Sequence, residues 1–189
     1  MSDTSAGSSQ VAGVVLAAGE GRRFGGPKAP YVHEGERLVD RSVRLLREAG
    51  CDPVFVILGA WEGRVDGALV IVNHGWEEGM GSSLRIALKW VNATTDADHA
   101  LITLVDLPGL TTEAIARVAQ APGDFVVATF DGERGHPVRI PRAHFRDLID
   151  SVAGDEGARS FLTGRDDVEF IELGDIADGH DMDEAPSAR

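Results

Sequence analysis

Short apolar runs alternate with amphipathic stretches along this chain, and this alternation limits the fold more than any other feature. We expect strands near 11–17, 54–58, 68–72, 100–105, 125–129, 136–140 and 168–172. We expect helices near 38–49, 82–92, 112–120, 142–151 and 157–163. Strands that alternate with helices favour a mostly parallel sheet with helices on both faces. The predicted fold is therefore a single-domain, Rossmann-like α/β protein with three layers, α/β/α.

The domain boundaries follow from length and local composition. A chain of 189 residues is long enough for one domain with a substantial core. Residues 1–10 are rich in Ser and Gly and lack the basic and apolar segments of a secretory signal, so we expect a disordered arm there. Residues 11–186 then form the domain. No apolar run approaches the ~20 residues of a membrane span, so we expect no membrane partner.

Charge and cysteine content narrow the function further. The formal net charge is -13, which argues against binding to nucleic acid because that function needs a basic surface. The single cysteine, Cys51, excludes a disulfide within the chain and favours a reducing compartment such as the cytoplasm. Cys51 lies between a predicted helix and a buried strand, so we interpret it as an inert thiol rather than a nucleophile.

A glycine-rich, cationic loop follows the first predicted strand. Residues 16–28 read Leu-Ala-Ala-Gly-Glu-Gly-Arg-Arg-Phe-Gly-Gly-Pro-Lys. Glycines allow the backbone to approach a ligand closely, and successive free N–H groups form a concave site for anions. Arg22, Arg23 and Lys28 add positive charge to this loop in an otherwise acidic chain. The loop is therefore predicted to hold a triphosphate.

The spacing of this loop separates it from two common phosphate loops. A P-loop that starts at Gly21 needs a lysine where Pro27 stands, and the lysine that is present, Lys28, is followed by Ala29 and not by a hydroxyl residue. A dinucleotide fingerprint needs a third glycine where Phe24 stands, although Asp40 lies where its ribose-binding acid would be expected. Neither pattern is satisfied, so the loop belongs to another class.

Two further polar segments follow predicted strands. The stretch Asn73–Leu84 offers glycine backbone and the hydroxyls of Ser82 and Ser83 at a helix start, where we expect the serines to cap the helix. Asp106 ends an apolar strand and precedes Leu-Pro, so it is either a hard oxygen ligand for Mg²⁺ or the cap of a helix that begins after Pro108. All three loops should meet at the carboxyl edge of the sheet.

Two segments later in the chain are candidates for binding an acceptor. Gly135–Val138 begins a strand, and Gly154–Arg159 forms a glycine turn with Asp155 as the expected N-cap of a helix. Arg159 lies one turn into that helix, where it either binds an anionic acceptor or forms a surface ion pair. We interpret His136 as a positioning or packed histidine, because an ionised phosphate monoester needs no general base.

The motifs resemble those of one family when they are taken together and in order. The pattern Leu-x-x-Gly-x-x-x-Arg-Phe/Met-Gly-x-x-Lys resembles the nucleotide-binding loop of GT-A-type nucleotidyltransferases, and within these the MobA/MocA-type molybdenum cofactor (molybdopterin) nucleotidylyltransferases. Asn-x-x-Trp-x-x-Gly-Met-x-x-Ser-Leu, Asp-x-Pro, Gly-x-Pro and Gly-Asp-x-Gly-Ala-Arg also match, over residues 15–186. The family closes with Asp-x-Asp/Asn-Thr-Pro-Glu-Asp, whereas this chain has Asp181-Met-Asp-Glu-Ala-Pro, in which the Thr-Pro step is displaced.

The resemblance implies Mg²⁺-dependent transfer of a nucleotidyl group to a phosphate-bearing acceptor, molybdopterin, with release of pyrophosphate and no protein nucleophile. The implied catalytic residues are Arg23, Lys28 and Asp106. The implied metal ligands are Asp106 and Asp183, with Asp181 as the alternative to Asp183. The segment that holds Asp181 and Asp183 could instead be a solvated acidic tail without a metal. The implied nucleotide-binding residues are Leu16, Ala17, Ala18, Gly19, Gly21, Gly25, Asn73, Gly79, Ser82 and Ser83. The implied acceptor-binding residues are His136, Asp155, Gly157 and Arg159.

The nucleotide base follows from one position in the loop. Leu-Ala-Ala-Gly resembles the cytidylyl branch, whereas the guanylyl branch more often has Leu-Ala-Gly-Gly, and a methyl group at Ala18 would narrow the base pocket against a purine. We therefore expect CTP as the donor. The alternatives are guanylyl transfer, a sugar- or polyol-phosphate nucleotidyltransferase, and a non-catalytic accessory protein that binds a nucleotide or cofactor and serves a client molybdoenzyme.

Overall fold

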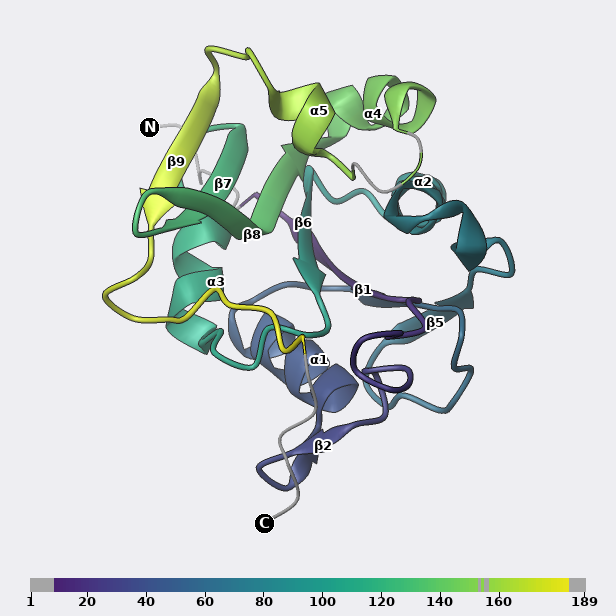
Figure 1. The fold of residues 1–189 in the computed structure, drawn as a ribbon. Helices are drawn as coiled ribbons and strands as arrows, with labels where there is room; N and C mark the ends of the chain where they lie inside the picture. The colour runs from purple at the N-terminus through teal and green to yellow at the C-terminus, as the bar shows by residue number, and fades with distance from the viewer. Residues whose placement is uncertain (1–8, 153, 155–156, 184–189) are drawn as a thin grey trace, which may run out of the picture.

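A seven-stranded sheet runs through the middle of the protein in the computed structural model, which describes residues 9–152, 154 and 157–183 (Figure 1). The strands lie in the order β5-β4-β1-β6-β8-β7-β9. Their bounds are β1 Val11–Ala17, β4 Val54–Leu58, β5 Leu69–Val72, β6 His99–Leu104, β7 Phe125–Phe130, β8 Glu133–Pro141 and β9 Val168–Glu172. Each of the seven predicted strands is present, with ends shifted by no more than a few residues.

The sheet is mostly parallel, with one reversed strand. β5, β4, β1 and β6 are mutually parallel, and β9 is parallel to β7. β8 runs antiparallel to both β6 and β7. The reversal follows from the connection between β7 and β8, which is a tight turn with positive φ at Asp131 (51°) and Gly132 (82°). Such a turn joins neighbouring antiparallel strands.

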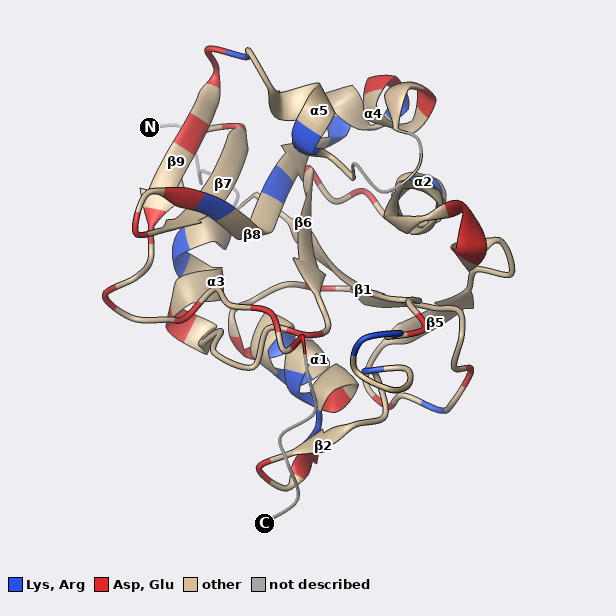
Figure 2. Cartoon of the chain, in the orientation of Figure 1, with Lys and Arg blue, Asp and Glu red and all other residues tan. Residues whose placement is uncertain are grey.

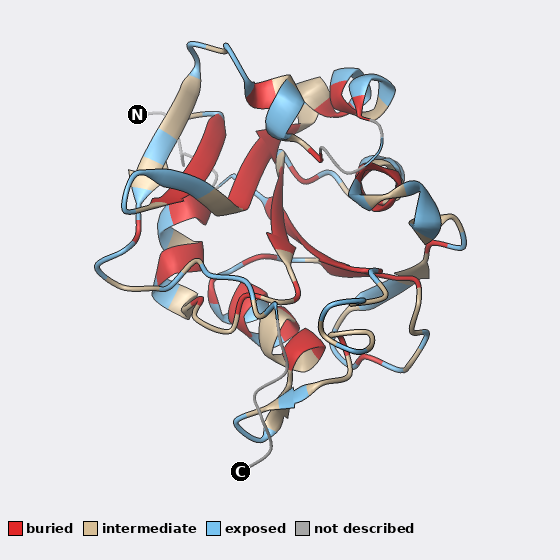
Figure 3. Cartoon of the chain, viewed as in Figure 1, coloured by how far each residue is buried: buried red, intermediate tan, exposed pale blue. Residues whose placement is uncertain are grey.

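Helices cover both faces of this sheet, as predicted. Their bounds are α1 Leu38–Glu48, α2 Met80–Thr94, α3 Thr112–Ala119, α4 Phe145–Ser151 and α5 Arg159–Leu162, with 3-10 turns η1 Trp76–Glu78 and η2 Arg142–His144. Side chains alternate between the faces along β1: Val15 packs with α1 and α3, and Val14 packs with α2 and α4. Both residues are fully buried, and the central strands form the core (Figure 3).

Several local expectations were wrong or incomplete. α2 begins at Met80 with Gly79 as its N-cap, so Ser82 and Ser83 lie inside the first turn and do not cap it. The cap of α3 is Thr111, whose Oγ1 accepts a hydrogen bond from Ala114 N at 3.1 Å, so Asp106 does not cap that helix. A small hairpin of β2 (Val32–His33) and β3 (Glu36–Arg37) was not predicted.

Two further expectations concerned the N-terminal residues and Cys51. Residues 1–8 of the expected arm lie outside the described residues, whereas Gln10 is bound to Asp98 through its N–H at 3.0 Å. Cys51 is buried, as expected for a position between a helix and a buried strand, and burial raises the pKa of its thiol to about 12. Among the described residues, the helices are too short or too polar to span a bilayer.

Candidate active site

Three loops that follow β1, β5 and β6 meet at one edge of the sheet and line a cavity of about 450 Å³. The lining comes from residues 16–22 with Lys28, from the 76–83 segment, and from residues 104–106. The meeting of these loops was predicted, because the carboxyl ends of parallel strands share an edge. We call this space the first cavity.

The glycine loop closes on itself around Gly21. The Gly21 carbonyl accepts hydrogen bonds from Gly25 N at 2.9 Å and from Gly26 N at 3.1 Å. Gly21 has a φ of +62°, and a Cβ at this position would overlap Gly26 O, so only glycine fits. Gly19 lines the cavity in open space. Gly25 does not line it, and its N–H is already used inside the loop.

The positive charges of this loop are divided between the cavity and its rim. Figure 2 shows blue segments in the loop that follows β1. Arg22, which was not among the expected binding residues, lines the first cavity and pairs with Glu20. Arg23 does not line the cavity and is 80% exposed. The loop therefore offers a positive rim to an anion.

Gly59, directly after β4, packs closely against two residues that line the first cavity, Ala18 and Trp76. An ideal Cβ on Gly59 would lie 2.8 Å from Ala18 Cβ and 2.7 Å from Trp76 Cβ. Ala18 O also accepts a hydrogen bond from Ala60 N at 3.0 Å. Ala18 is therefore held against Gly59. Leu16 and Ala17, which directly precede it in the chain, also line the first cavity. Gly59 was not predicted to be near the site, although a glycine directly after a buried strand could have indicated a close approach of the backbone there.

A buried asparagine ties the loop after β5 to the start of α2. Asn73 Nδ2 donates to Ser82 Oγ at 2.8 Å and to Ser83 Oγ at 2.9 Å, and its Oδ1 accepts from Gly75 N. Ser83 and Gly79 line the first cavity, whereas Asn73 and Ser82 do not. Asn73 and Ser82 therefore position this loop, and they do not contact the cavity.

An ion pair stands in the first cavity. Lys28 Nζ lies 2.7 Å from Asp106 Oδ2, and the two side chains are only 15% and 18% exposed. The other carboxylate oxygen, Asp106 Oδ1, is buried and has no hydrogen-bond partner among the described residues. A buried carboxylate oxygen without a partner is costly, and it suits a hard cation. The residues present therefore fit a divalent metal at Asp106.

The C-terminal segment returns to the same place. Met182 N donates to the Asp106 carbonyl at 2.9 Å. Burial raises the pKa of Asp181, and repulsion from Asp106 adds to this shift. Asp183 instead pairs with Arg23 across 3.2 Å, and neither side chain lines the first cavity. Asp181 is thus influenced by the charge of Asp106, and it too is absent from the residues that line the first cavity.

A second cavity of about 220 Å³ adjoins the first, and both are lined by Leu16 and Met80. His136, Gly157 and Arg159 line it, whereas Asp155 lies outside the described residues. The prediction that Arg159 lies one turn into its helix was wrong, because α5 begins at Arg159 with Ala158 at the N-cap position. The remaining wall is largely apolar and was not predicted. The apolar lining residues on this side are Leu84, Ile102, Val127, Val138, Ala158 and Leu162.

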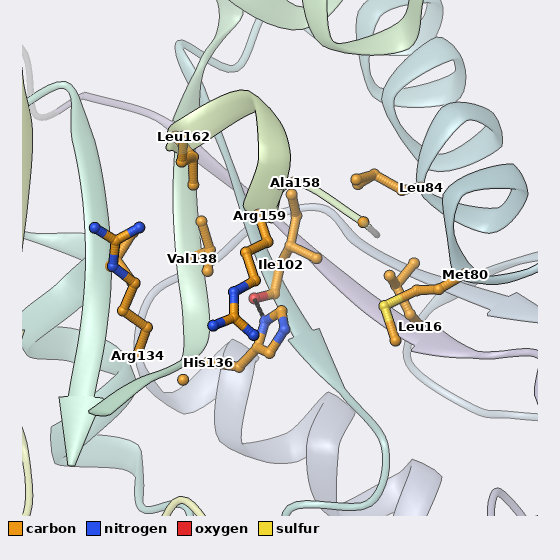
Figure 4. Close-up of a pocket in the computed structure, with 13 residues that line it drawn as sticks. Leu16, Met80, Leu84, Ile102, Arg134, His136, Val138, Ala158, Arg159 and Leu162 are labelled. Carbon is orange, nitrogen blue, oxygen red and sulfur yellow. Dashed lines mark hydrogen bonds between the residues drawn. The ribbon is translucent and has the colours of Figure 1, made fainter. Parts of the chain in front are cut away.

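The polar groups of the second cavity differ in their surroundings. The Arg159 side chain extends toward His136 (Figure 4), whereas the guanidinium of Arg134, a residue of β8, lies 4.7 Å from the centre of the Phe170 ring. No ion pair joins Arg159 to another described residue. Burial lowers the pKa of His136, although a hydrogen-bond contact of 3.3 Å with the Ile102 carbonyl opposes the shift. His136 is therefore neutral near pH 7, and Arg159 is the available cation.

The chain is similar in sequence to known proteins and to the model of one protein family. The model of the MobA-like NTP transferase domain matches residues 13–168. Nicotine blue oxidoreductase from Paenarthrobacter nicotinovorans is 35% identical over 92% of both chains. A probable molybdenum cofactor guanylyltransferase from Mycobacterium ulcerans is 30% identical over 88% of this chain and 86% of that protein.

Solved structures agree with this similarity. Rv0371c from Mycobacterium tuberculosis has a TM-score of 0.76 and 27% identity, over 88% of this chain and 89% of that one. Its complex with manganese has a TM-score of 0.71 and 25% identity, over 87% and 88% of the two chains. The predicted fold and the resemblance stated above are thus confirmed.

Proposed function

The chain belongs to the MobA-like NTP transferase domain family, and on that premise we propose that it transfers CMP from CTP to molybdopterin and releases pyrophosphate. The observation that carries this proposal is the pair of adjoining cavities, which share Leu16 and Met80. One cavity has the glycine loop and the Lys28–Asp106 pair, and the other has Arg159. A donor and an acceptor held in adjoining cavities can react in line without a protein nucleophile.

The first cavity would hold the triphosphate. Gly19 and Gly21 line it and would offer backbone N–H groups to the phosphates, and Arg22 would contribute a guanidinium there. Arg23 stands at the rim, where it would reach a phosphate after leaving Asp183. Lys28 is close enough to the same space to neutralise charge that builds on the α-phosphate and the leaving pyrophosphate. Charge neutralisation of this kind is the main protein contribution to nucleotidyl transfer.

A divalent metal, which we propose to be Mg²⁺, would be held by Asp106. Mg²⁺ is commonly bound by one or two carboxylates together with substrate phosphates, which suits a site with few protein ligands. When bound, the metal would offset the negative charge of the triphosphate. Asp181 is the better candidate for a second carboxylate, because Asp183, the residue expected from the sequence, pairs with Arg23.

The second cavity would hold the acceptor. Arg159 would bind the acceptor phosphate, and neutral His136 would position it without removing a proton. The apolar wall favours an acceptor with a ring system over a polyol phosphate, whose hydroxyl groups would lose hydrogen bonds with water. This preference supports molybdopterin over a sugar phosphate as the acceptor. A client molybdoenzyme would then receive the product.

The preference for CTP is supported by the packing at Ala18. Ala18 packs closely against Gly59, so its methyl group would have little room to move away from a base that binds beside it. Relatives named guanylyltransferases make GTP the main competitor. Pyrophosphate release should be measured with each of four nucleoside triphosphates, with molybdopterin and then with a sugar phosphate. CTP and molybdopterin should give the highest rate, and Ala18→Gly should shift the preference toward GTP. A higher kcat/KM with GTP in the wild type would refute the cytidylyl assignment.

A redox reaction is the second candidate, because a relative with 35% identity is named nicotine blue oxidoreductase. The loop argues against it, since Phe24 stands where a dinucleotide fingerprint needs its third glycine. Oxidation of a reduced nicotinamide cofactor should be followed with nicotine blue and without any triphosphate. Protein-dependent turnover under these conditions would favour this candidate over nucleotidyl transfer.

A further inference from the structure

Lys28 and Asp106 form an ion pair in the first cavity, so each neutralises the charge of the other. Their side chains are more than four-fifths buried, so the pair is screened by water far less than a surface ion pair. Both residues are nevertheless needed elsewhere if the proposed function is correct. Lys28 would have to face phosphate, and Asp106 would have to face a metal. The pair must therefore separate when substrate binds.

We infer that Lys28 is a stand-in cation that keeps the affinity of the free protein for divalent metal low until a triphosphate draws the ammonium away. This inference rests on the proposed function, because it assumes that a triphosphate enters the first cavity. Lys28 Nζ satisfies Asp106 Oδ2, and Asp106 Oδ1 has no partner among the described residues. A metal that arrives alone would meet a carboxylate whose charge is already balanced.

The surroundings of Lys28 allow its ammonium to move while its backbone stays in place. The Lys28 carbonyl accepts a hydrogen bond from Tyr31 N at 3.0 Å, which anchors the main chain. The Phe24 ring lies 5.9 Å from Nζ, and it packs edge-on against Tyr31. Within the described part of the chain the ammonium makes a single ion pair, to Asp106, and it is carried on a flexible four-carbon stem. Rotation of this stem would move the charge within the cavity.

Exchange of partners couples the two ligands. When phosphate takes Lys28, the Asp106 carboxylate loses its counter-ion and its affinity for a cation rises. By linkage, a metal that binds Asp106 releases Lys28 and raises the affinity for phosphate by the same factor. Metal and triphosphate therefore bind cooperatively, even before any contact between the two is counted. The direct contact between a metal and phosphate would add to this coupling in every variant.

The test is the dissociation constant of Mn²⁺, measured by calorimetry on the full chain with and without a non-hydrolysable CTP analogue. Lys28→Met keeps the apolar stem and removes the charge. Without nucleotide, Lys28→Met should bind Mn²⁺ at least about tenfold more tightly than the wild type, a change of about 1.4 kcal/mol. The factor by which the analogue tightens Mn²⁺ binding should be smaller in Lys28→Met than in the wild type.

Lys89→Met is the matched control, because it makes the same change of residue type at an exposed position of α2, away from the first cavity. Its Mn²⁺ affinity should stay within about twofold of the wild type, since an exposed charge is well screened. Equal tightening in Lys89→Met and Lys28→Met would overturn the inference, because only the net charge of the protein would then matter. Unchanged or weaker Mn²⁺ binding in Lys28→Met would also overturn it.

Separate control experiments check that the variants fold and that the wild type binds nucleotide. Lys28→Met leaves a buried carboxylate without its partner, so its melting temperature is compared with that of Lys28→Gln, whose amide can donate a neutral hydrogen bond to Asp106. If Lys28→Met does not fold, Lys28→Gln takes its place in the calorimetry, with the same expected tightening. Failure of the wild type to bind the CTP analogue would count against the proposed function, whereas the comparison without nucleotide would still decide the role of Lys28.

Discussion

Replacement of Gly21 by alanine should disable the glycine loop while the fold survives. The residue has a φ of +62°, which costs an alanine about 1–2 kcal/mol. The added Cβ would overlap Gly26 O, so the loop must move and lose the hydrogen bonds from Gly25 N and Gly26 N, each worth about 1 kcal/mol. The total of about 3 kcal/mol corresponds to about a hundredfold loss in nucleotide affinity.

The assay is the Kd of a fluorescent CTP analogue together with the melting temperature. The loop is partly exposed and can rearrange locally, so the melting temperature should change little while the Kd rises strongly. Gly132→Ala is the matched control, because Gly132 also has positive φ (+82°), a Cβ there would meet nothing within 4 Å, and it lies far along the chain in the β7–β8 turn. Its nucleotide affinity should equal that of the wild type. Wild-type affinity in Gly21→Ala would refute the reasoning about this loop.

Three further predictions concern the rest of the fold. Arg139→Met should lower the free energy of unfolding by on the order of 3 kcal/mol in chemical denaturation, since the buried guanidinium donates to the carbonyls of residues 119, 121 and 123; an unchanged midpoint would contradict this. Backbone N–H donors of residues 132 and 174 hold the pKa of Glu172 at about 2. The ionised Glu172 side chain therefore stabilises the fold above its unfolded pKa of about 4.3, and this contribution is lost as the pH falls toward 2. The melting temperatures of Glu172→Gln and the wild type should therefore differ at pH 7 and converge near pH 2. A difference that stays the same at both pH values would disprove this. The Cys51 thiol, whose pKa is about 12, should stay unreactive toward a disulfide reagent at pH 8 until the protein is denatured, and rapid native-state labelling would show the burial to be wrong.

The strands and the meeting of the loops were predictable because both depend on patterns local to the sequence. Buried strands in a parallel sheet are continuous apolar runs, and β1 and β4 are of this kind. The carboxyl edge of such a sheet then gathers whatever follows each strand, which placed Asp106 near the glycine loop. The reversal of β8 was not predicted, although Asp131-Gly132 is a known hairpin signal.

Contacts between distant segments could not be predicted in the same way. The pairing of Arg23 with Asp183 joins residues 160 positions apart, and no local pattern announces it. Ser82 and Ser83 looked like helix caps, but the amide of Asn73 binds both hydroxyls inside the first turn. The apolar wall of the second cavity comes from several separate elements, so each residue looked like ordinary core in the sequence.

Nucleotidyl transfer at Asp106 is tested most directly by pyrophosphate release from CTP with Mg²⁺ and molybdopterin, compared between the wild type and Asp106→Asn. The asparagine keeps the shape of the side chain and removes its charge, and Asp166→Asn, an exposed acid in the loop before β9, is the matched control. The wild type and Asp166→Asn should release pyrophosphate only when both substrates are present, and Asp106→Asn should lose at least about a hundredfold in kcat, which is about 2.7 kcal/mol of transition-state stabilisation. Wild-type rates in Asp106→Asn, or no release from the wild type with any triphosphate, would contradict this account.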